Sequence, residues 1–167
     1  DPATVEASRR GAVQLDAVTF RTLLLLLYGA GLRFGEATRL ALADVDLANA
    51  VLTIRATKFY KSRLVPVGPQ LAAVLDRHVS QRRQAGLVEG RSALLLANQD
   101  ETRLASSTVQ AAFDTLRRVA GVHRLAAGRT IPRLDDLRHS FAVHRLTSWY
   151  RQGADVQRLL PVLSTYL

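Results

Sequence analysis

Lysine is rare in this chain and is confined to one short polar segment. Of the 23 lysine and arginine residues, only Lys58 and Lys61 are lysines. A lysine ammonium is able to release a proton, whereas an arginine stays protonated in proteins. Lys58 or Lys61 is therefore a candidate general acid at the tip of a predicted β-hairpin that can reach over a substrate. The alternative is that the two lysines fall by chance in a solvated turn.

A second candidate group follows a glycine-limited turn and consists of Arg33 and Glu36, in the segment Gly31-Leu32-Arg33-Phe34-Gly35-Glu36. Arg33 stands at a predicted helix start, where backbone N–H groups and its guanidinium can face one anion. Glu36 comes three residues later and is placed to orient or neutralise Arg33. The plainer alternative is a helix N-cap with an ion pair worth roughly 0.2–0.5 kcal/mol.

The third candidate is Arg138, in a segment over 134–145 that predicts a helix with one buried face. Apolar residues recur there at helical spacing, namely Leu134, Leu137 and Phe141. Arg138 lies beside that face, and an arginine held on a rigid helix among polar side chains suits a planar oxyanion such as phosphate. The alternative is an ordinary amphipathic helix, with Asp135 or Asp136 as its N-cap and an Asp135–His139 pair one turn apart.

Composition and charge favour a partner that is a polyanion. The chain has 167 residues, about one domain, and its 48% hydrophobic residues are enough for a core. A formal net charge of +9 indicates DNA, RNA or an anionic membrane as the partner. No apolar run reaches membrane-spanning length, and the absence of cysteine excludes disulfides and thiolate metal sites. A cytoplasmic nucleic-acid protein is the simplest interpretation.

The pattern of elements predicts a mainly α-helical fold with a small antiparallel β-sheet (α+β). Two strands, at 51–55 and 63–67, form the predicted hairpin, and Pro66 implies an edge position for the second. The segment 44–49 is predicted to be a turn, and 94–96 a strand or buried turn. Ser106 or Ser107 is predicted to cap a helix whose inner face includes Leu116 and Val119. The predicted helices are 17–28, 34–42, 69–84, 106–120 and the stretch from Leu134 to Arg158, broken at Gly153.

The three candidate groups occur in an order that resembles the catalytic domain of the tyrosine recombinases, the phage-integrase family. The matching segments are Tyr28 to Ala37, Thr57 to Pro66 and Leu134 to His144. Lys58 follows Arg33 by 58 − 33 = 25 residues, about the interval in that family. No single segment is decisive, but the ordered set is strong, and the similarity spans roughly Leu15 to Leu167.

The resemblance implies DNA strand exchange without a metal or nucleotide cofactor. A tyrosine attacks the scissile phosphodiester, forms a 3′-phosphotyrosyl enzyme and releases a 5′-hydroxyl. By match, Arg33 and Arg138 clamp the non-bridging oxygens, Lys58 protonates the leaving 5′-oxygen, and His139 and Glu36 act in support. The implied partner is double-stranded DNA, bound by a homotetramer, with no role for a membrane.

Asp135 departs from the family pattern, because the third segment normally opens with histidine at that position. A carboxylate there repels phosphate and does not act as an imidazole does, which places full activity in doubt. Asp135 is then either a helix cap that tolerates reduced activity or the mark of a degenerate protein.

The resemblance also predicts how the chain divides. Residues 1–14 are expected to be a linker from a missing N-terminal core-binding domain, and residues 15–167 a catalytic domain that is incomplete at its C-terminal end. No tyrosine of this chain matches the position of the nucleophile, neither Tyr28, Tyr60, Tyr150 nor Tyr166. We therefore expect the nucleophile beyond Leu167 and the chain alone to be inactive.

Three alternatives to a recombinase remain open at this stage. A type IB topoisomerase shares the arginine, lysine and tyrosine chemistry but relaxes supercoils. The second alternative is a non-catalytic DNA-binding or regulatory protein on a decayed recombinase scaffold, in which Asp135 in place of histidine would be expected. A plain helical interaction module would require Arg33, Lys58 and Arg138 to lie far apart in space.

Overall fold

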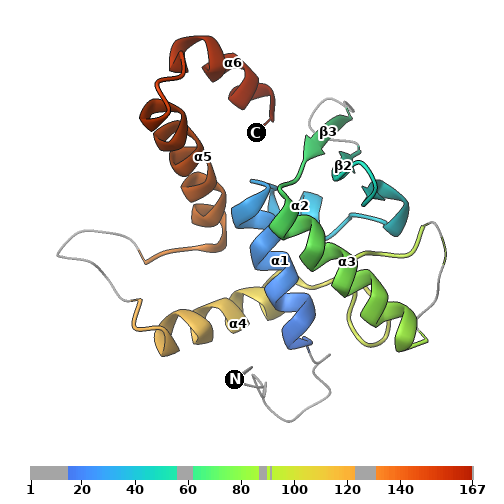
Figure 1. Cartoon of the computed structure of the whole chain (residues 1–167). Helices are drawn as coiled ribbons and strands as arrows, with labels where there is room; N and C mark the ends of the chain where they lie inside the picture. The colour runs from blue at the N-terminus through green and yellow to red at the C-terminus, as the bar shows by residue number, and fades with distance from the viewer. Residues whose placement is uncertain (1–14, 56–61, 87–89, 91, 123–130, 167) are drawn as a thin grey trace.

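Six α-helices and a small sheet make up the described part of the chain in a computed structural model, which covers residues 15–55, 62–86, 90, 92–122 and 131–166 (Figure 1). The sequence prediction of a mainly α-helical fold with a small antiparallel sheet is confirmed. The helices are α1 (Ala17–Gly29), α2 (Phe34–Ala37), α3 (Pro69–Gln84), α4 (Ser106–Val119), α5 (Leu134–Arg151) and α6 (Val156–Tyr166).

Helix α1 is the centre of the core and packs against both α3 and α5 (Figure 1). It begins where predicted, because the carboxylate of Asp16 accepts a hydrogen bond from the backbone N–H of Thr19 at 2.8 Å. Its leucine-rich inner face is fully buried, with Leu23 and Leu26 among the best-covered side chains. This burial makes α1 the rigid support from which the following turn projects.

The sheet has three strands in the order β1-β2-β3, all antiparallel: β1 (Val45–Asp46), β2 (Val51–Ile54) and β3 (Arg63–Pro66). The predicted hairpin is confirmed, and Pro66 lies on an edge strand as expected. The prediction that 44–49 is only a turn is wrong, because Val45 and Asp46 pair with the start of β2. A two-residue strand is too short to show alternation in sequence.

Helix α3 follows the sheet and is confirmed at both ends. Gly68 precedes it, Pro69 occupies its first position, and it ends at Gln84. Its inner face carries a buried histidine, His78, whose Nε2–H donates to the carbonyl oxygen of Leu95 at 2.9 Å. That hydrogen bond ties α3 to the buried 94–96 segment, where Leu94 forms a β-bridge with Ala41.

Helix α2 is shorter than predicted, ending at Ala37 instead of near Leu42. The chain turns after Thr38 because the backbone around Leu40 and Ala41 bonds to the 94–96 segment, and Leu95 N–H donates to Leu40 oxygen at 2.7 Å. This partner lies more than 50 positions away in the chain, so a local helical pattern does not reveal it.

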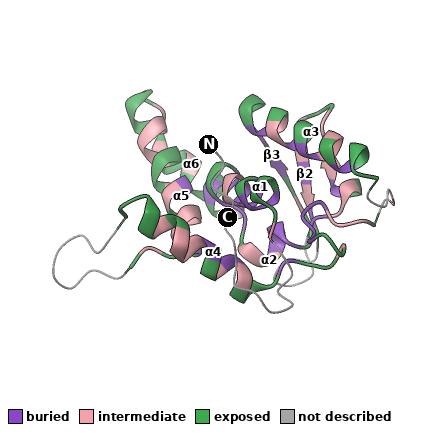
Figure 2. Cartoon of the chain, turned by 90° about the horizontal axis from the view of Figure 1, so that it is seen from below, coloured by how far each residue is buried: buried purple, intermediate pink, exposed green. Residues whose placement is uncertain are grey.

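Helix α4 departs from the prediction in its cap and in its inner face. Its N-cap residue is Ala105, so neither Ser106 nor Ser107 caps it. Val109 and Ala112 are buried, but Val119 is 79% exposed. Figure 2 shows this decline in burial from the middle of the molecule outward, and α5 and α6 consist mainly of intermediate and exposed residues. The last turns of α4 have apolar spacing, but no element among the described residues covers Val119.

Helix α5 runs unbroken from Leu134 through Arg151, and the predicted break at Gly153 is confirmed, with φ of +69°. Helix α6 follows and contains Pro161. Near the start of α5, Leu134 and Phe141 are buried and Leu137 packs against the core, as their spacing predicts. No helix in the part of the chain that the structure describes is long and apolar enough to cross a membrane.

Candidate active site: three arginines around one buried carboxylate

The turn between α1 and α2 delivers Arg33 to the surface. Gly31 adopts a left-handed conformation (φ +61°), which reverses the chain immediately after α1. Arg33 then serves as the N-cap residue of α2, and its backbone N–H donates to Glu36 Oε2 at 2.9 Å. Its side chain is 54% exposed, so its guanidinium faces solvent while one nitrogen reaches Glu36 Oε1 at 3.3 Å.

Glu36 is the buried centre of the site, with a side chain only 4% exposed. Arg63, the first residue of β3, donates to both carboxylate oxygens, Nη1 to Oε1 and Nη2 to Oε2, each at 2.9 Å. Such a bidentate pair is the strongest form of arginine–carboxylate contact. Glu36 therefore joins α2 to the second strand of the hairpin.

Arg138 approaches the same carboxylate from α5. Its Nη1 donates to the carbonyl oxygen of Gly31 at 2.6 Å and lies 3.8 Å from Glu36 Oε2. Its side chain is 13% exposed, which confirms the prediction of a position close to the core but not inside it. Arg33 and Arg138, more than 100 positions apart in sequence, thus lie at one site. A plain helical interaction module would instead place them far apart.

Burial and charge oppose one another in setting the ionisation of this cluster. Burial alone would raise the pKa of Glu36, but hydrogen bonds from Arg63 and from the Arg33 backbone outweigh it, so the net pKa lies below the ordinary glutamate value. Burial lowers the pKa of Arg138, and the positive charge of Arg33 lowers it further. Arginine stays protonated even so. The cluster therefore carries three positive charges against one negative charge.

The N-cap residue of α5 is Arg133, so the prediction that Asp135 or Asp136 occupies the N-cap is wrong, although Asp136 supports the helix start from its third position. The Asp136 carboxylate accepts a hydrogen bond from the backbone N–H of Arg133 at 2.7 Å. Asp135 is exposed, and its negative charge acts on Arg138 in the direction that raises the pKa of that arginine. His139, one position beyond Arg138, is also exposed. Asp135 is therefore available to act on the site, because it has no capping role.

Lys58 and Lys61 lie outside the described residues. The functional residue that sequence reasoning missed is Arg63. Two signals pointed to it: it stands five positions after Lys58, and it opens a strand whose second apolar residue, Val65, is buried. An arginine at a strand start is nevertheless common on solvated edges, so its inward direction becomes evident only in the fold.

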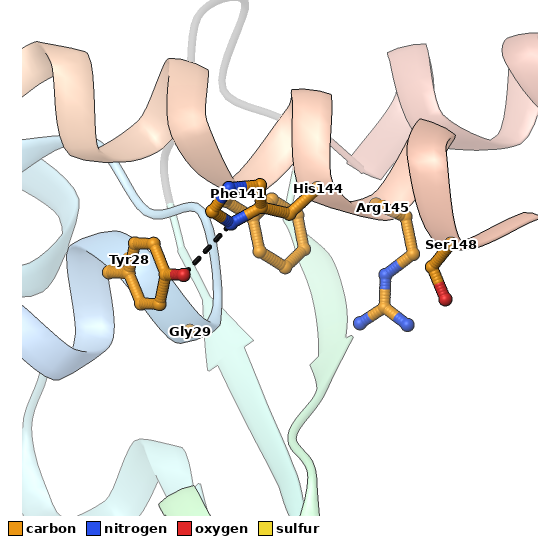
Figure 3. Close-up of a pocket in the computed structure, with 6 residues that line it drawn as sticks. All are labelled: Tyr28, Gly29, Phe141, His144, Arg145 and Ser148. Atoms are coloured by element: carbon orange, nitrogen blue, oxygen red, sulfur yellow. Dashed lines mark hydrogen bonds between the residues drawn. The ribbon is translucent and has the colours of Figure 1, made fainter.

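A second contact fastens α1 to α5 beside this cluster (Figure 3). The Tyr28 hydroxyl lies 2.8 Å from His144 Nδ1, and the two rings meet edge to face. Arg145 extends over the ring of Phe141, and both help to line a shallow pocket next to this pair. Tyr28 lies three residues before Gly31, and His144 lies six residues beyond Arg138, so their contact holds α1, which leads into the Arg33 turn, against the helix that carries Arg138.

Comparison with known proteins gives one consistent result. The model of the phage integrase family matches residues 4–161. A protein named as a candidate integrase/recombinase, y4rB of Sinorhizobium fredii, is 46% identical over 149 residues, covering 89% of this chain and 47% of that protein. The tyrosine recombinase XerC 2 of Ralstonia nicotianae is 34% identical, covering 86% of this chain and 38% of that protein.

Solved structures agree on the fold. The crystal structure of the XerA recombinase superposes with a TM-score of 0.63 at 24% identity, over 84% of this chain and 46% of that one. XerH recombinase bound to a palindromic difH substrate gives a TM-score of 0.62 at 22% identity, over 90% of this chain and 39% of that one. The chain spans about half the length, or less, of the curated relatives that it matches.

Proposed function

Because this chain belongs to the phage integrase family, we propose that it is the catalytic part of a site-specific DNA recombinase that cleaves and rejoins double-stranded DNA. A tyrosine oxygen attacks the phosphorus, the bond to the 5′-oxygen breaks, and a 3′-phosphotyrosyl protein forms. A second DNA end reverses the step. The covalent intermediate conserves the bond energy, so neither a nucleotide nor a metal cofactor is needed.

One observation supports this proposal most strongly, and it is the convergence of Arg33 and Arg138 on Glu36. Two guanidiniums from separate helices are held beside the same buried carboxylate, with Arg33 largely exposed to solvent. Fixed positive charges of this kind stabilise the negative charge that develops on phosphate oxygens in a transition state. We assign to both arginines the binding of the non-bridging oxygens and to Glu36 their orientation.

The remaining roles are proposed from the match to the family. Lys58 protonates the leaving 5′-oxygen, and His139 supports the phosphate by hydrogen bonding. Asp135 stands where the family has histidine and places a negative charge near Arg138. We expect this charge to slow cleavage without abolishing it, because the three arginines still exceed the two carboxylates, Glu36 and Asp135.

The nucleophilic tyrosine is proposed to lie outside these 167 residues, and the active assembly to be a homotetramer on DNA. We expect a gene of bacterial or phage origin and a reaction in the cytoplasm. These expectations make the complete reading frame that contains this chain the right material for a test.

The test is capture of a covalent adduct. Protein from the complete reading frame is incubated with a pool of nicked duplexes with a randomised core, from which the short fragment that carries the released 5′-hydroxyl diffuses away. Adducts are separated on a denaturing gel, and their DNA is sequenced. The proposal predicts an adduct at a discrete sequence that disappears in the Arg138→Ala variant. Salt-sensitive DNA binding without any adduct would refute it.

A second candidate is a DNA-binding or regulatory protein on a decayed recombinase scaffold, and the exposed Asp135 beside Arg138 favours it. It predicts no adduct and DNA binding that survives Arg138→Ala. The Asp135→His variant separates the two: a protein whose only defect is this carboxylate gains cleavage, whereas a decayed scaffold does not. A type IB topoisomerase activity would instead relax a supercoiled plasmid without exchanging strands.

A further inference from the structure

Arg63 makes closer contact with Glu36 than either arginine of the proposed phosphate site. Both of its terminal nitrogens donate to the carboxylate at 2.9 Å, whereas the side-chain contacts of Arg33 and Arg138 are 3.3 and 3.8 Å. Arg63 is also well covered, with 14% of its side chain exposed. It is therefore held facing inward, unlike Arg33, which faces solvent.

The hydrogen bonds of Arg63 help to fill the acceptor capacity of Glu36. A carboxylate offers about four lone-pair positions. Oε1 accepts from Arg63 and from the Arg33 side chain, and Oε2 accepts from Arg63 and from the Arg33 backbone. Arg138, 3.8 Å from Oε2, stands just beyond hydrogen-bonding distance. All of the acceptor positions of Glu36 are therefore occupied by Arg33 and Arg63, without a hydrogen bond from Arg138.

Removal of Arg63 would change both the geometry and the charge of the cluster. Two acceptor positions on Glu36 would become vacant, and Arg138 is the donor best placed to move into one of them. The net charge would fall from two positive charges to one, where a pentavalent phosphate carries about two negative charges. Glu36 would then compete with the phosphate for the same guanidinium.

We propose that Arg63 is a positioning residue for DNA cleavage, which saturates Glu36 and thereby keeps Arg138 and Arg33 directed at the scissile phosphate. The inference rests on the proposed function above. It gives the hairpin strand β3 a task distinct from that of Lys58, because Arg63 acts on the arginines through Glu36 and touches no reacting atom.

The test compares two substrates built on the DNA sequence captured in the adduct assay. One carries a normal scissile phosphate and the other a methylphosphonate, which lacks the negative charge that the arginines neutralise. Wild type, Arg63→Gln, Arg63→Lys and the double variant Arg63→Gln/Glu36→Gln are compared, all made from the complete reading frame. Arg55→Gln is the matched control, because Arg55, directly after β2, pairs with another buried carboxylate, Asp44, directly before β1.

We expect Arg63→Gln to slow cleavage of the phosphate about 100-fold, the cost typical of a misplaced catalytic group, and cleavage of the methylphosphonate less than about 3-fold. The double variant should recover about 10-fold on the phosphate, because the competing carboxylate is gone. Arg63→Lys should fall between wild type and Arg63→Gln, since it keeps the charge but not the bidentate fork. Arg55→Gln should leave the ratio of the two rates unchanged.

Equal slowing of both substrates by Arg63→Gln would overturn the inference and reduce Arg63 to a structural ion pair, as would a double variant no faster than the single one. If Arg63→Gln does not fold, as judged by circular dichroism, the double variant and Arg63→Lys decide, because the first also removes the buried charge of Glu36 and the second keeps a cation at position 63. Failure of the proposed function is visible separately, since wild type would then form no adduct with the phosphate.

Discussion

The carboxylate of Glu36 is expected to carry more stability than any other single charge in the described part of the chain, and Glu36→Gln isolates that contribution. The amide keeps the shape and one acceptor oxygen but removes the charge that three guanidiniums share. Arg33, Arg63 and Arg138 would then repel one another without a counter-charge, and two of them have side chains less than 15% exposed.

Breaking a buried ion pair by neutralising one partner costs about 3–5 kcal/mol. For a chain of this length, each 1 kcal/mol lowers the melting temperature by about 2–4 °C. We therefore expect Glu36→Gln to lower the melting temperature by roughly 6–20 °C at pH 7. Since total stabilities are about 5–15 kcal/mol, the variant should still fold at low temperature.

The assay is thermal and urea unfolding followed by circular dichroism, with Asp76→Asn as control. Asp76 is an exposed carboxylate on α3, and its change should cost less than about 0.5 kcal/mol. A loss below about 1 kcal/mol for Glu36→Gln would refute the claim that the carboxylate holds the cluster together.

Glu36→Gln should also change how the stability of the protein depends on pH. The pKa of Glu36 lies below the ordinary value, so the folded state binds a proton less readily than the unfolded state. This contribution to stability is present at neutral pH and is lost as pH falls below about 4.3, the ordinary glutamate value. Glu36→Gln should flatten that part of the pH profile, and an unchanged acid limb would contradict the assignment.

Three further changes test other parts of the fold. Burial lowers the pKa of His78, so stability should fall by up to about 1.4 kcal/mol per pH unit below pH 6.5, and His78→Gln should remove that slope in urea unfolding. Tyr28→Phe should cost about 0.5–1 kcal/mol, against nearly nothing for the 79%-exposed Tyr150→Phe. Gly31→Ala should cost about 1–2 kcal/mol because φ is positive, and weaken DNA binding by turning Arg33, whereas Gly68→Ala, with open space around it and a negative φ, should be neutral.

Local signals in the sequence predicted those elements whose ends are set by neighbouring residues. Asp16 caps α1, Gly68 and Pro69 open α3, and Gly153 separates α5 from α6, and each acts within one or two turns of itself. The positions of Arg33 and Arg138 beside buried faces were likewise readable from apolar spacing.

Features set by distant partners could not be predicted in this way. Helix α2 ends early because the backbone after it bonds to a segment more than 50 residues later, and Val119 is exposed because none of the elements in the described ranges covers it. The inward direction of Arg63 depends on Glu36, which lies 27 positions before it. The sequence identified Arg33, Arg138 and Glu36, and the fold was needed to find Arg63 and to show that Glu36 joins all three arginines.

The hydrogen bond from Arg138 to Gly31 has a consequence for the timing of synthesis. Its two residues are 107 positions apart. A ribosome adds about 5–20 residues per second, so roughly 5–20 s pass between the appearance of the turn and that of the arginine which closes on it. During that interval the nascent chain displays Arg33 but lacks the complete set of guanidiniums. The proposed phosphate site is therefore incomplete on the nascent chain until Arg138 has been synthesised.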